Sequence, residues 1–380
     1  MQQNLLGAYG PWAAQIVGRT PGALSLRTGK FTDIEQWREQ ARARLWECLA
    51  APELPEAPPV TVEWSGSADG LHAEKLSWQL PYGPRTEAVF LKPEGATGPL
   101  PGILALHDHG GMKYFGWRKI AQVDAQTHPM IAEHRNDDYG GLAWANEIAR
   151  RGYAVLVHDT YAFASRRVRI ADVSPVIARG VRDPGPEEAS EEIRAYNRWA
   201  AEHEAIMAMG LFCAGTTWPA VTLREDQVAL SLLCARPDVD AERVGCGGLS
   251  GGGLRTVYLA WLDDRIRNCF CAGFMTTWQD LLLNKSYTHT WMTYTPLLAR
   301  DLDFPEILGL RAPKPTLVLN CTEDPLFTTS EVEICGQILA EVYARAGAPE
   351  AFRLSLYPGG HKLDAPMQAE AFEWLDRWLK

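Results

Sequence analysis

Short apolar runs, each bounded by glycine, proline or polar residues, recur along most of the chain and predict β-strands. The runs near the N-terminal end predict strands at Val60 to Trp64, Leu71 to Leu80, Thr86 to Leu91 and Gly102 to Leu106. The first three look antiparallel, whereas the fourth looks buried. Later runs predict strands at Tyr153 to His158, Arg243 to Cys246, Asn268 to Gly273, Thr316 to Asn320 and Phe352 to Tyr357.

Helical patterns lie between these later strands. They predict helices at Leu142 to Arg151, Arg224 to Ala235, Gly253 to Leu262, Thr329 to Ala346 and Pro366 to Leu379. Strands that alternate with helices are typical of a parallel sheet covered on both faces, so the expected fold class is α/β. Two stretches, at about 112 to 140 and about 160 to 215, are too long for bare loops and predict further helices over the top of the sheet.

The beginning of the chain has a different pattern, which predicts a helical segment at residues 1–58 packed on a main domain at residues 59–380. The run Phe31-Thr32-Asp33-Ile34-Glu35 is typical of a helix cap. The helix after it carries apolar residues at helical spacing, namely Trp37, Ala41, Leu45 and Leu49. A proline-rich run at residues 51–59 ends this helix.

Composition limits the expected partners and compartment. The formal net charge is −10 with acidic and basic residues interspersed, so no nucleic-acid partner is expected. The first residues show no charged start followed by an apolar run, so we expect no secretory signal and no membrane anchor, and we expect the cytoplasm. The eight cysteines are dispersed and include no C-x-x-C pair, which indicates reduced thiols rather than a structural zinc site.

The sharpest motif is Gly248-Leu249-Ser250-Gly251-Gly252, which follows a predicted strand and precedes a predicted helix. At such a turn a serine is held in a strained conformation that exposes its hydroxyl, and small neighbours are needed because the helix and the strand approach closely. The motif therefore makes Ser250 the candidate nucleophile. The alternative is a glycine-rich turn with an incidental serine.

A serine hydroxyl needs a base to take its proton, and that base needs a third group to orient it. His361 follows the predicted strand ending at Tyr357, and Asp324 follows the one ending at Asn320. Glu323 competes for the acid role, and so does Asp159, although Asp159 lies on the wrong strand for the order serine, acid, histidine. The alternatives are a turn-forming Asp-Pro pair and an ordinary loop histidine.

Two backbone N–H groups usually stabilise the oxyanion of acyl transfer. We expect one from Gly251 and the other from the loop after the fourth strand, at His109 or Gly110. His107 and His109 could instead be read as a metal pair, but no further ligand cluster follows them. No metal and no cofactor is therefore expected.

With these motifs assembled, the chain resembles the dienelactone-hydrolase and acetyl-xylan-esterase branch of the α/β-hydrolases. The matching segments are residues 106–111, 152–159, 237–240 and 248–252, together with Asp324 and residues 359–361. The resemblance implies an α/β-hydrolase catalytic domain at 59–380, a triad of Ser250, Asp324 and His361, and hydrolysis of carboxylic esters through an acyl-enzyme. Gly251 stands where many relatives carry Met or Asn, and residues 161–164 stand where a glycine-rich turn is usual, so the resemblance indicates the reaction class but not the substrate.

Aromatic residues gather between the strands that end near Gly273 and begin near Thr316. In this fold that segment lies over the site, so the expected substrate-binding residues are Trp278, His289 and Trp291, with His107 and Asp108 from the oxyanion loop. The same aromatic residues could equally be core. The expected partner is a small-molecule ester, with acylated carbohydrates among the candidates, and nothing in the sequence indicates the oligomeric state. The alternatives are an amidase or peptidase of the prolyl-oligopeptidase type and a catalytically silent scaffold.

Overall fold

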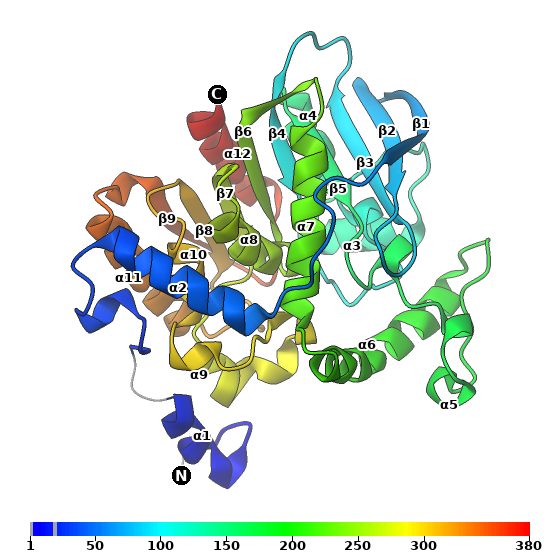
Figure 1. The fold of residues 1–380 in the computed structure, drawn as a ribbon. Coiled ribbons are helices and arrows are strands. Elements are labelled where there is room, and N and C mark those ends of the chain that lie inside the picture. Colours follow the sequence, from blue (N-terminus) through cyan, green and yellow to red (C-terminus); the bar gives the residue numbers. More distant parts are fainter. Residues whose placement is uncertain (1–2, 18–20) are drawn as a thin grey trace.

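A nine-stranded sheet runs through the middle of the molecule, in the order β1-β2-β3-β5-β4-β6-β7-β8-β9 (Figure 1). The computed structural model describes residues 3–17 and 21–380. The strands are β1 (Val60–Ala68), β2 (Leu71–Trp78), β3 (Thr86–Pro93), β4 (Leu100–Ala105), β5 (Ala154–His158), β6 (Val239–Leu249), β7 (Ile266–Ala272), β8 (Thr316–Cys321) and β9 (Phe352–Tyr357). Pairing is antiparallel from β1 to β5 and parallel from β5 to β9. The sheet confirms all nine predicted strands and the α/β class.

Helices cover both faces of the sheet. One face carries α7 (Trp218–Cys234), α8 (Gly251–Leu262), α10 (Phe304–Gly309) and α11 (Thr329–Arg345). The other carries α4 (Trp144–Arg150) and α12 (Ala365–Leu379). Alternate residues of a strand enter the two cores: Cys269 and Cys271 of β7 pack on the first face, and Phe270 packs on the second. The prediction that helices cover both faces of the sheet is therefore confirmed, and each face has its own apolar core.

The helix predicted after the cap signal is α2 (Ile34–Leu49), which packs outside the helices of the first face. Asp33 caps it by accepting a hydrogen bond from the Glu35 amide at 2.9 Å. Its predicted apolar side chains, Trp37 and Leu45 among them, are fully buried. Arg345 of α11 holds the chain before α2, because its guanidinium donates to the carbonyls of residues 26 and 31, both at 2.5 Å.

The N-terminal segment also contains α1 (Gly10–Val17), which contacts residues 281–285. Within the predicted segment 1–58, residues 1–2 and 18–20 lie outside the described residues. The division into a segment 1–58 and a domain 59–380 stays a prediction.

The two stretches that fitted neither pattern contain α3 (Pro129–Tyr139), α5 (Pro175–Ala178) and α6 (Ser190–Cys213). Tyr114, Ile131 and Tyr196 join them in a third apolar cluster. Figure 1 shows α6 running from α5, out at one side of the sheet, to the start of α7. The expected helices are therefore present, but α5 and the first half of α6 extend sideways rather than over the sheet.

Helix length and hydropathy also bear on membrane insertion. No single helix in the described ranges is long and apolar enough to span a membrane. Helices α6 and α7 are long and apolar enough for a span only when they are taken together, and a bend of 86° separates them. The side chains of α7 pack largely in the core.

We predict that Leu45→Ala lowers the free energy of unfolding by about 2–5 kcal/mol, because it leaves a cavity between α2 and the helices beneath it. Urea denaturation followed by circular dichroism measures the change. Glu39→Ala, at an exposed position of the same helix, is the control and should change stability by less than about 0.5 kcal/mol. An equal, small effect of both substitutions would show that α2 is not part of the cooperative core.

Candidate active site

Ser250 occupies a sharp turn between β6 and α8. Its backbone has φ 56° and ψ −117°, a conformation that non-glycine residues rarely adopt. Its amide donates to the carbonyl of Ala272 at the end of β7, at 2.8 Å. This hydrogen bond ties the turn to the neighbouring strand, so the side chain of Ser250 emerges at the carboxyl ends of the parallel strands.

Glycines around Ser250 allow the start of α8 to lie against the strand ends. A Cβ on Gly248 or Gly252 would lie 2.2 or 2.1 Å from the carbonyl oxygen of Leu106. A Cβ on Gly253 would lie 2.6 Å from the carbonyl oxygen of Ala272. Backbone cannot move aside as a flexible side chain can, so larger residues here would force α8 away from β4 and β7.

His361 and Asp324 meet at the same edge of the sheet. His361 Nδ1 lies 2.6 Å from Oδ2 of Asp324, and the other carboxylate oxygen accepts a hydrogen bond from the Leu326 amide at 2.9 Å. Asp324 is buried, whereas the neighbouring Glu323 is exposed. Of the two adjacent carboxylates, Asp324 is therefore the one that orients the imidazole.

The ring of His361 lies beside the strand end that holds Ser250. A Cβ on Gly273 would lie 2.9 Å from His361 Cε1, and Gly273 directly follows Ala272, the hydrogen-bond partner of the Ser250 amide. The Nε2 atom of His361 is buried and has no hydrogen-bond partner among the described residues. It is the atom through which the imidazole could take a proton.

Asp159, the other competitor for the acid role, is bound elsewhere. Its carboxylate accepts hydrogen bonds from the Trp117 amide at 2.8 Å and from the Ser165 hydroxyl at 2.7 Å. Burial raises the pKa of Asp159 to about 6, although these hydrogen bonds oppose the rise. Asp159 therefore anchors the chain near Trp117, and it does not contact His361.

The candidate oxyanion donors converge on the start of α8. A Cβ on Gly251 would lie 2.7 Å from the amide nitrogen of His109, so these two backbones touch. Gly251 is the first residue of α8, where an N–H has no carbonyl partner within the helix. Gly110 has φ 54°, and a Cβ there would lie 2.4 Å from Asp108 Oδ2. The contact with Gly251 favours His109 over Gly110.

The side chains of His107 and Asp108, which were expected to contact substrate, are buried against other parts of the protein. Both are buried, and burial holds the pKa of His107 well below its usual value. The Asp108 carboxylate accepts a hydrogen bond from Tyr139 at 2.6 Å and lies 3.2 Å from both Lys119 Nζ and His134 Nε2. Burial opposes its ionisation, but Lys119 and His134 outweigh burial and hold the pKa of Asp108 well below its usual range.

The His107 and His109 pair also lacks the geometry of a metal site. His107 Nδ1 lies 2.9 Å from the carbonyl of Asp108, and His109 Nε2 lies 2.7 Å from a carboxylate oxygen of Glu204. In the part of the chain that the structure describes, no three His, Cys, Asp or Glu side chains gather as metal ligands. Each imidazole is instead engaged with the protein itself.

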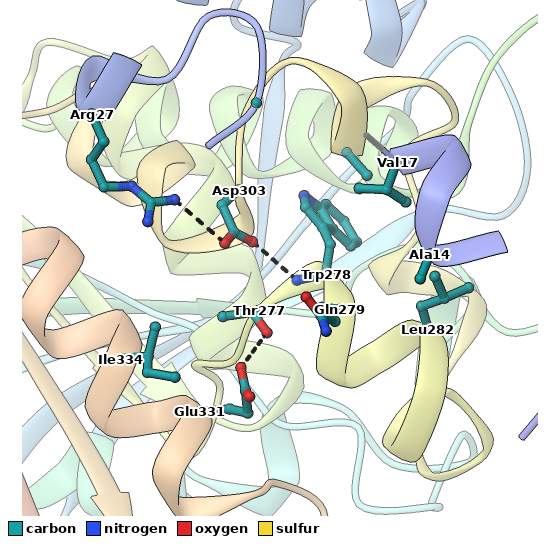
Figure 2. Close-up of a pocket in the computed structure, with 12 residues that line it drawn as sticks. Ala14, Val17, Arg27, Thr277, Trp278, Gln279, Leu282, Asp303, Glu331 and Ile334 are labelled. Carbon is teal, nitrogen blue, oxygen red and sulfur yellow. Dashed lines mark hydrogen bonds and ion pairs between the residues drawn. The ribbon is translucent and has the colours of Figure 1, made fainter. Parts of the chain in front are cut away.

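Trp278, in α9 (Trp278–Asp280), packs in the core, which was the alternative to its expected substrate-binding role. It donates from Nε1 to the carbonyl of Leu302 at 3.1 Å and is largely buried. It lines a cavity of about 240 Å³ that α1 and α11 also border. Figure 2 shows it beside Asp303. The described residues that line this cavity include none of the three candidate triad residues.

His289 and Trp291 have different surroundings. The ring of His289 lies 5.3 Å from that of Phe274 and 5.1 Å from that of Phe327, and Phe327 lies 6.4 Å from the His361 ring. Burial lowers the pKa of His289, and the nearby His361 lowers it further. Its Nδ1 lies 3.0 Å from the carbonyl of Lys285, whereas its buried Nε2 has no partner among the described residues. Trp291 is partly exposed beside α6.

Sequence reasoning did not identify several residues that hold the oxyanion loop. Glu204 of α6 binds His109 Nε2 and forms an ion pair with buried Lys113 at 2.6 Å. Lys113 is the main reason that the pKa of Glu204 falls to about 2, since burial alone would raise it. Arg255 of α8 donates to the carbonyl of His107 at 3.3 Å. Glu204 and Arg255 are far from the loop in sequence, and no local pattern marks them.

We predict that stability decreases between about pH 6.5 and pH 9 because of His134. Burial lowers its pKa, but Asp108 and Asp138 outweigh burial and raise the pKa of His134 to about 9. The folded protein thus holds this proton more tightly than the unfolded chain, so the stabilisation is complete below about pH 6.5 and is lost as the pH rises through 9. The loss is on the order of 3 kcal/mol.

Urea denaturation at several pH values tests this prediction. In His134→Gln, the free energy of unfolding should change less between pH 6.5 and pH 9 than it does in the wild type. His72→Gln, a more exposed histidine on β2, is the control and should keep the wild-type pH dependence. Identical pH dependence in wild type and His134→Gln would contradict the assignment.

Comparison with known proteins supports the fold. No protein-family model matches the chain. The chain is 27% identical to the putative hydrolase YtaP of Bacillus subtilis (strain 168) over 346 residues, which cover 90% of this chain and 100% of YtaP. A putative acetyl xylan esterase from Bacteroides fragilis NCTC 9343 superposes with a TM-score of 0.67 and 16% identity, over 93% of this chain and 83% of that one. A glucuronoyl esterase from Solibacter usitatus gives a TM-score of 0.63 and 16% identity, over 94% and 97%. With its sheet order and the turn at Ser250, the chain has the α/β-hydrolase fold.

Proposed function

We propose that this chain hydrolyses carboxylic esters through an acyl-enzyme on Ser250. The observation that carries the proposal is the unpartnered Nε2 of His361, which is buried beside the strand end that holds the strained Ser250, with Nδ1 bound to Asp324. A hydroxyl, an imidazole and a carboxylate in this relation are the parts that serine hydrolases need. The proteins compared above, which are named as a hydrolase and two esterases, support the same reaction class.

In the first step the Ser250 oxygen attacks the ester carbonyl carbon while His361 Nε2 takes the hydroxyl proton. Asp324 holds the Nδ1 proton and stabilises the imidazolium that forms. When the tetrahedral intermediate collapses, His361 returns the proton to the leaving alcohol oxygen and the acyl group stays on Ser250. In the second step, water attacks the acyl-enzyme while His361 takes a proton from the water. His361 then returns this proton to the Ser250 oxygen, so the carboxylic acid is released and the serine hydroxyl is restored.

Negative charge on the carbonyl oxygen is stabilised by N–H groups in this proposal. The amides of Gly251 and His109 supply them, because the two backbones touch at the start of α8. The N-terminal end of α8 adds favourable partial charge at the same place. Donors built into the backbone need no reorganisation during the reaction, which is why they are effective.

The substrate we propose is a small ester, with an acylated carbohydrate as the favoured class. His289, Phe274 and Phe327 form one wall beside His361, and the Nε2 of His289 offers a free acceptor for a substrate hydroxyl. Trp291 is an exposed aromatic of the same segment, as is Tyr287. We also propose a reducing compartment, the cytoplasm, because all eight cysteines are unpaired.

A fluorophosphonate probe should label the wild-type protein and leave Ser250→Ala unlabelled, because only an activated serine reacts with it. Labelling is read by mass spectrometry of the intact protein. Ser231→Ala is the control. This buried serine on α7 accepts a hydrogen bond from Arg265 and has no role in the proposed reaction, so labelling should persist. Equal labelling of Ser250→Ala would reject the nucleophile.

His361→Ala should lower kcat/KM for p-nitrophenyl acetate by at least about a thousandfold, because it removes the group proposed to take the serine proton. Asp324→Asn should also lower it strongly. His72→Gln, outside the site, is the control and should retain activity. A loss below tenfold in His361→Ala would exclude it as the base. Faster turnover of p-nitroanilides than of the matching esters would instead identify an amidase.

A further inference from the structure

Lys119 is a buried lysine whose ammonium binds the oxyanion loop. Its Nζ contacts the carbonyl oxygen of Asp108, lies 3.1 Å from the carbonyl oxygen of His109 and lies 3.2 Å from Asp108 Oδ2. An ammonium group has three N–H donors, and here each has one oxygen acceptor. The side chain is completely buried, with the Phe163 ring 5.0 Å away. The proposed reaction steps assign no role to this charge.

The contact with the Asp108 carbonyl sets the direction of the next N–H group. A trans peptide is planar, so its C=O and N–H point in opposite directions. Because the Asp108 carbonyl points at Lys119, the His109 N–H must point away from Lys119. A Cβ on Gly251 would lie 2.7 Å from the His109 nitrogen, so the start of α8 lies next to this peptide. The His109 N–H donates to no other described residue.

Other groups in turn hold Lys119 in place. The Asp108 carboxylate is fixed by the Tyr139 hydroxyl at 2.6 Å and by His134 at 3.2 Å. The carbonyl of Lys119 itself accepts a hydrogen bond from Arg135 Nε at 3.0 Å. The ammonium thus has a fixed position relative to both loop carbonyls, and a flip of the Asp108–His109 peptide would break its charge-assisted hydrogen bond to the Asp108 carbonyl together with the contact from His107 Nδ1.

We propose that Lys119 is a positioning residue for the oxyanion site: it fixes the Asp108–His109 peptide so that the His109 N–H faces the carbonyl oxygen of the substrate. This inference rests on the proposed esterase function and deepens it. It also gives a reason for the burial of the Asp108 carboxylate beside Lys119. Lys119 stabilises the transition state through the backbone, because the oxyanion is bound more tightly than the neutral ester.

Kinetics of Lys119→Met test the proposal. Loss of one oxyanion donor lowers kcat by about 10²–10³-fold, so a similar loss is expected here with KM changed less than threefold. The inhibition constant of phenylboronic acid, whose serine adduct places an oxygen in the oxyanion site, should rise along with the fall in kcat. Lys92→Met is the matched control, since Lys92 forms one ion pair with Asp238 on another part of the sheet. Lys92→Met should keep the wild-type kcat and the wild-type inhibition constant of phenylboronic acid.

A second variant covers the case in which Lys119→Met does not fold because it leaves Asp108 as a lone buried charge. Lys119→Met/Asp108→Asn removes both charges and still removes the ammonium donor from the two loop carbonyls, so that the Asp108 carbonyl keeps only His107 Nδ1 and the His109 carbonyl keeps only the Met112 amide. It should show the same fall in kcat and the same weaker binding of phenylboronic acid. Folding of each variant is checked by circular dichroism.

The outcomes separate the two proposals. If wild type hydrolyses p-nitrophenyl acetate and either folded variant keeps kcat within threefold, Lys119 does not position the donor and only this inference fails. A folded variant in which KM rises and kcat is unchanged overturns it too. If wild type neither turns over esters nor reacts with fluorophosphonate, the proposed function fails and takes this inference with it.

Discussion

The start of α8 can touch the ends of β4 and β7 only because three glycines carry no side chains there. Gly248 and Gly252 lie against the carbonyl of Leu106, and Gly253 lies against the carbonyl of Ala272. This close approach bends the chain so sharply that Ser250 takes a positive φ. Every other candidate group is placed relative to this turn: the histidine beside β7 and the oxyanion loop after β4.

Features that depend on strand ends could be predicted from the sequence. Parallel strands leave their carboxyl ends at one edge of the sheet, so residues that directly follow apolar runs come together there. This reasoning predicted that His361 would lie near Asp324, which the distance of 2.6 Å shows. It also predicted all nine strands, because each apolar run is bounded by glycine, proline or polar residues. Helix starts were less accurate: α7 begins at Trp218, before the predicted Arg224.

Side-chain direction could not be predicted in the same way. Asp108 lies in the oxyanion loop, and a polar residue there was expected to face substrate, yet Tyr139 and Lys119 bind it in the interior. These partners lie on segments that have no strong helical or strand pattern, so the sequence did not show that they would surround the loop. Trp278 was equally ambiguous, because an aromatic residue in a cap has the same local pattern whether it lines a site or packs in the core.

The buried pair of Lys119 and Asp108 is a poor way to gain stability. Desolvation of two charges costs about as much as their attraction returns, and apolar residues of similar size often do as well. An apolar pair, however, could not donate to the carbonyls of Asp108 and His109, which would keep only the His107 ring nitrogen and the Met112 amide as partners. The ammonium of Lys119 adds a charge-assisted donor to each carbonyl, which makes rotation of either peptide more costly. The arrangement is therefore better explained by the orientation of one N–H group than by the stability of the fold.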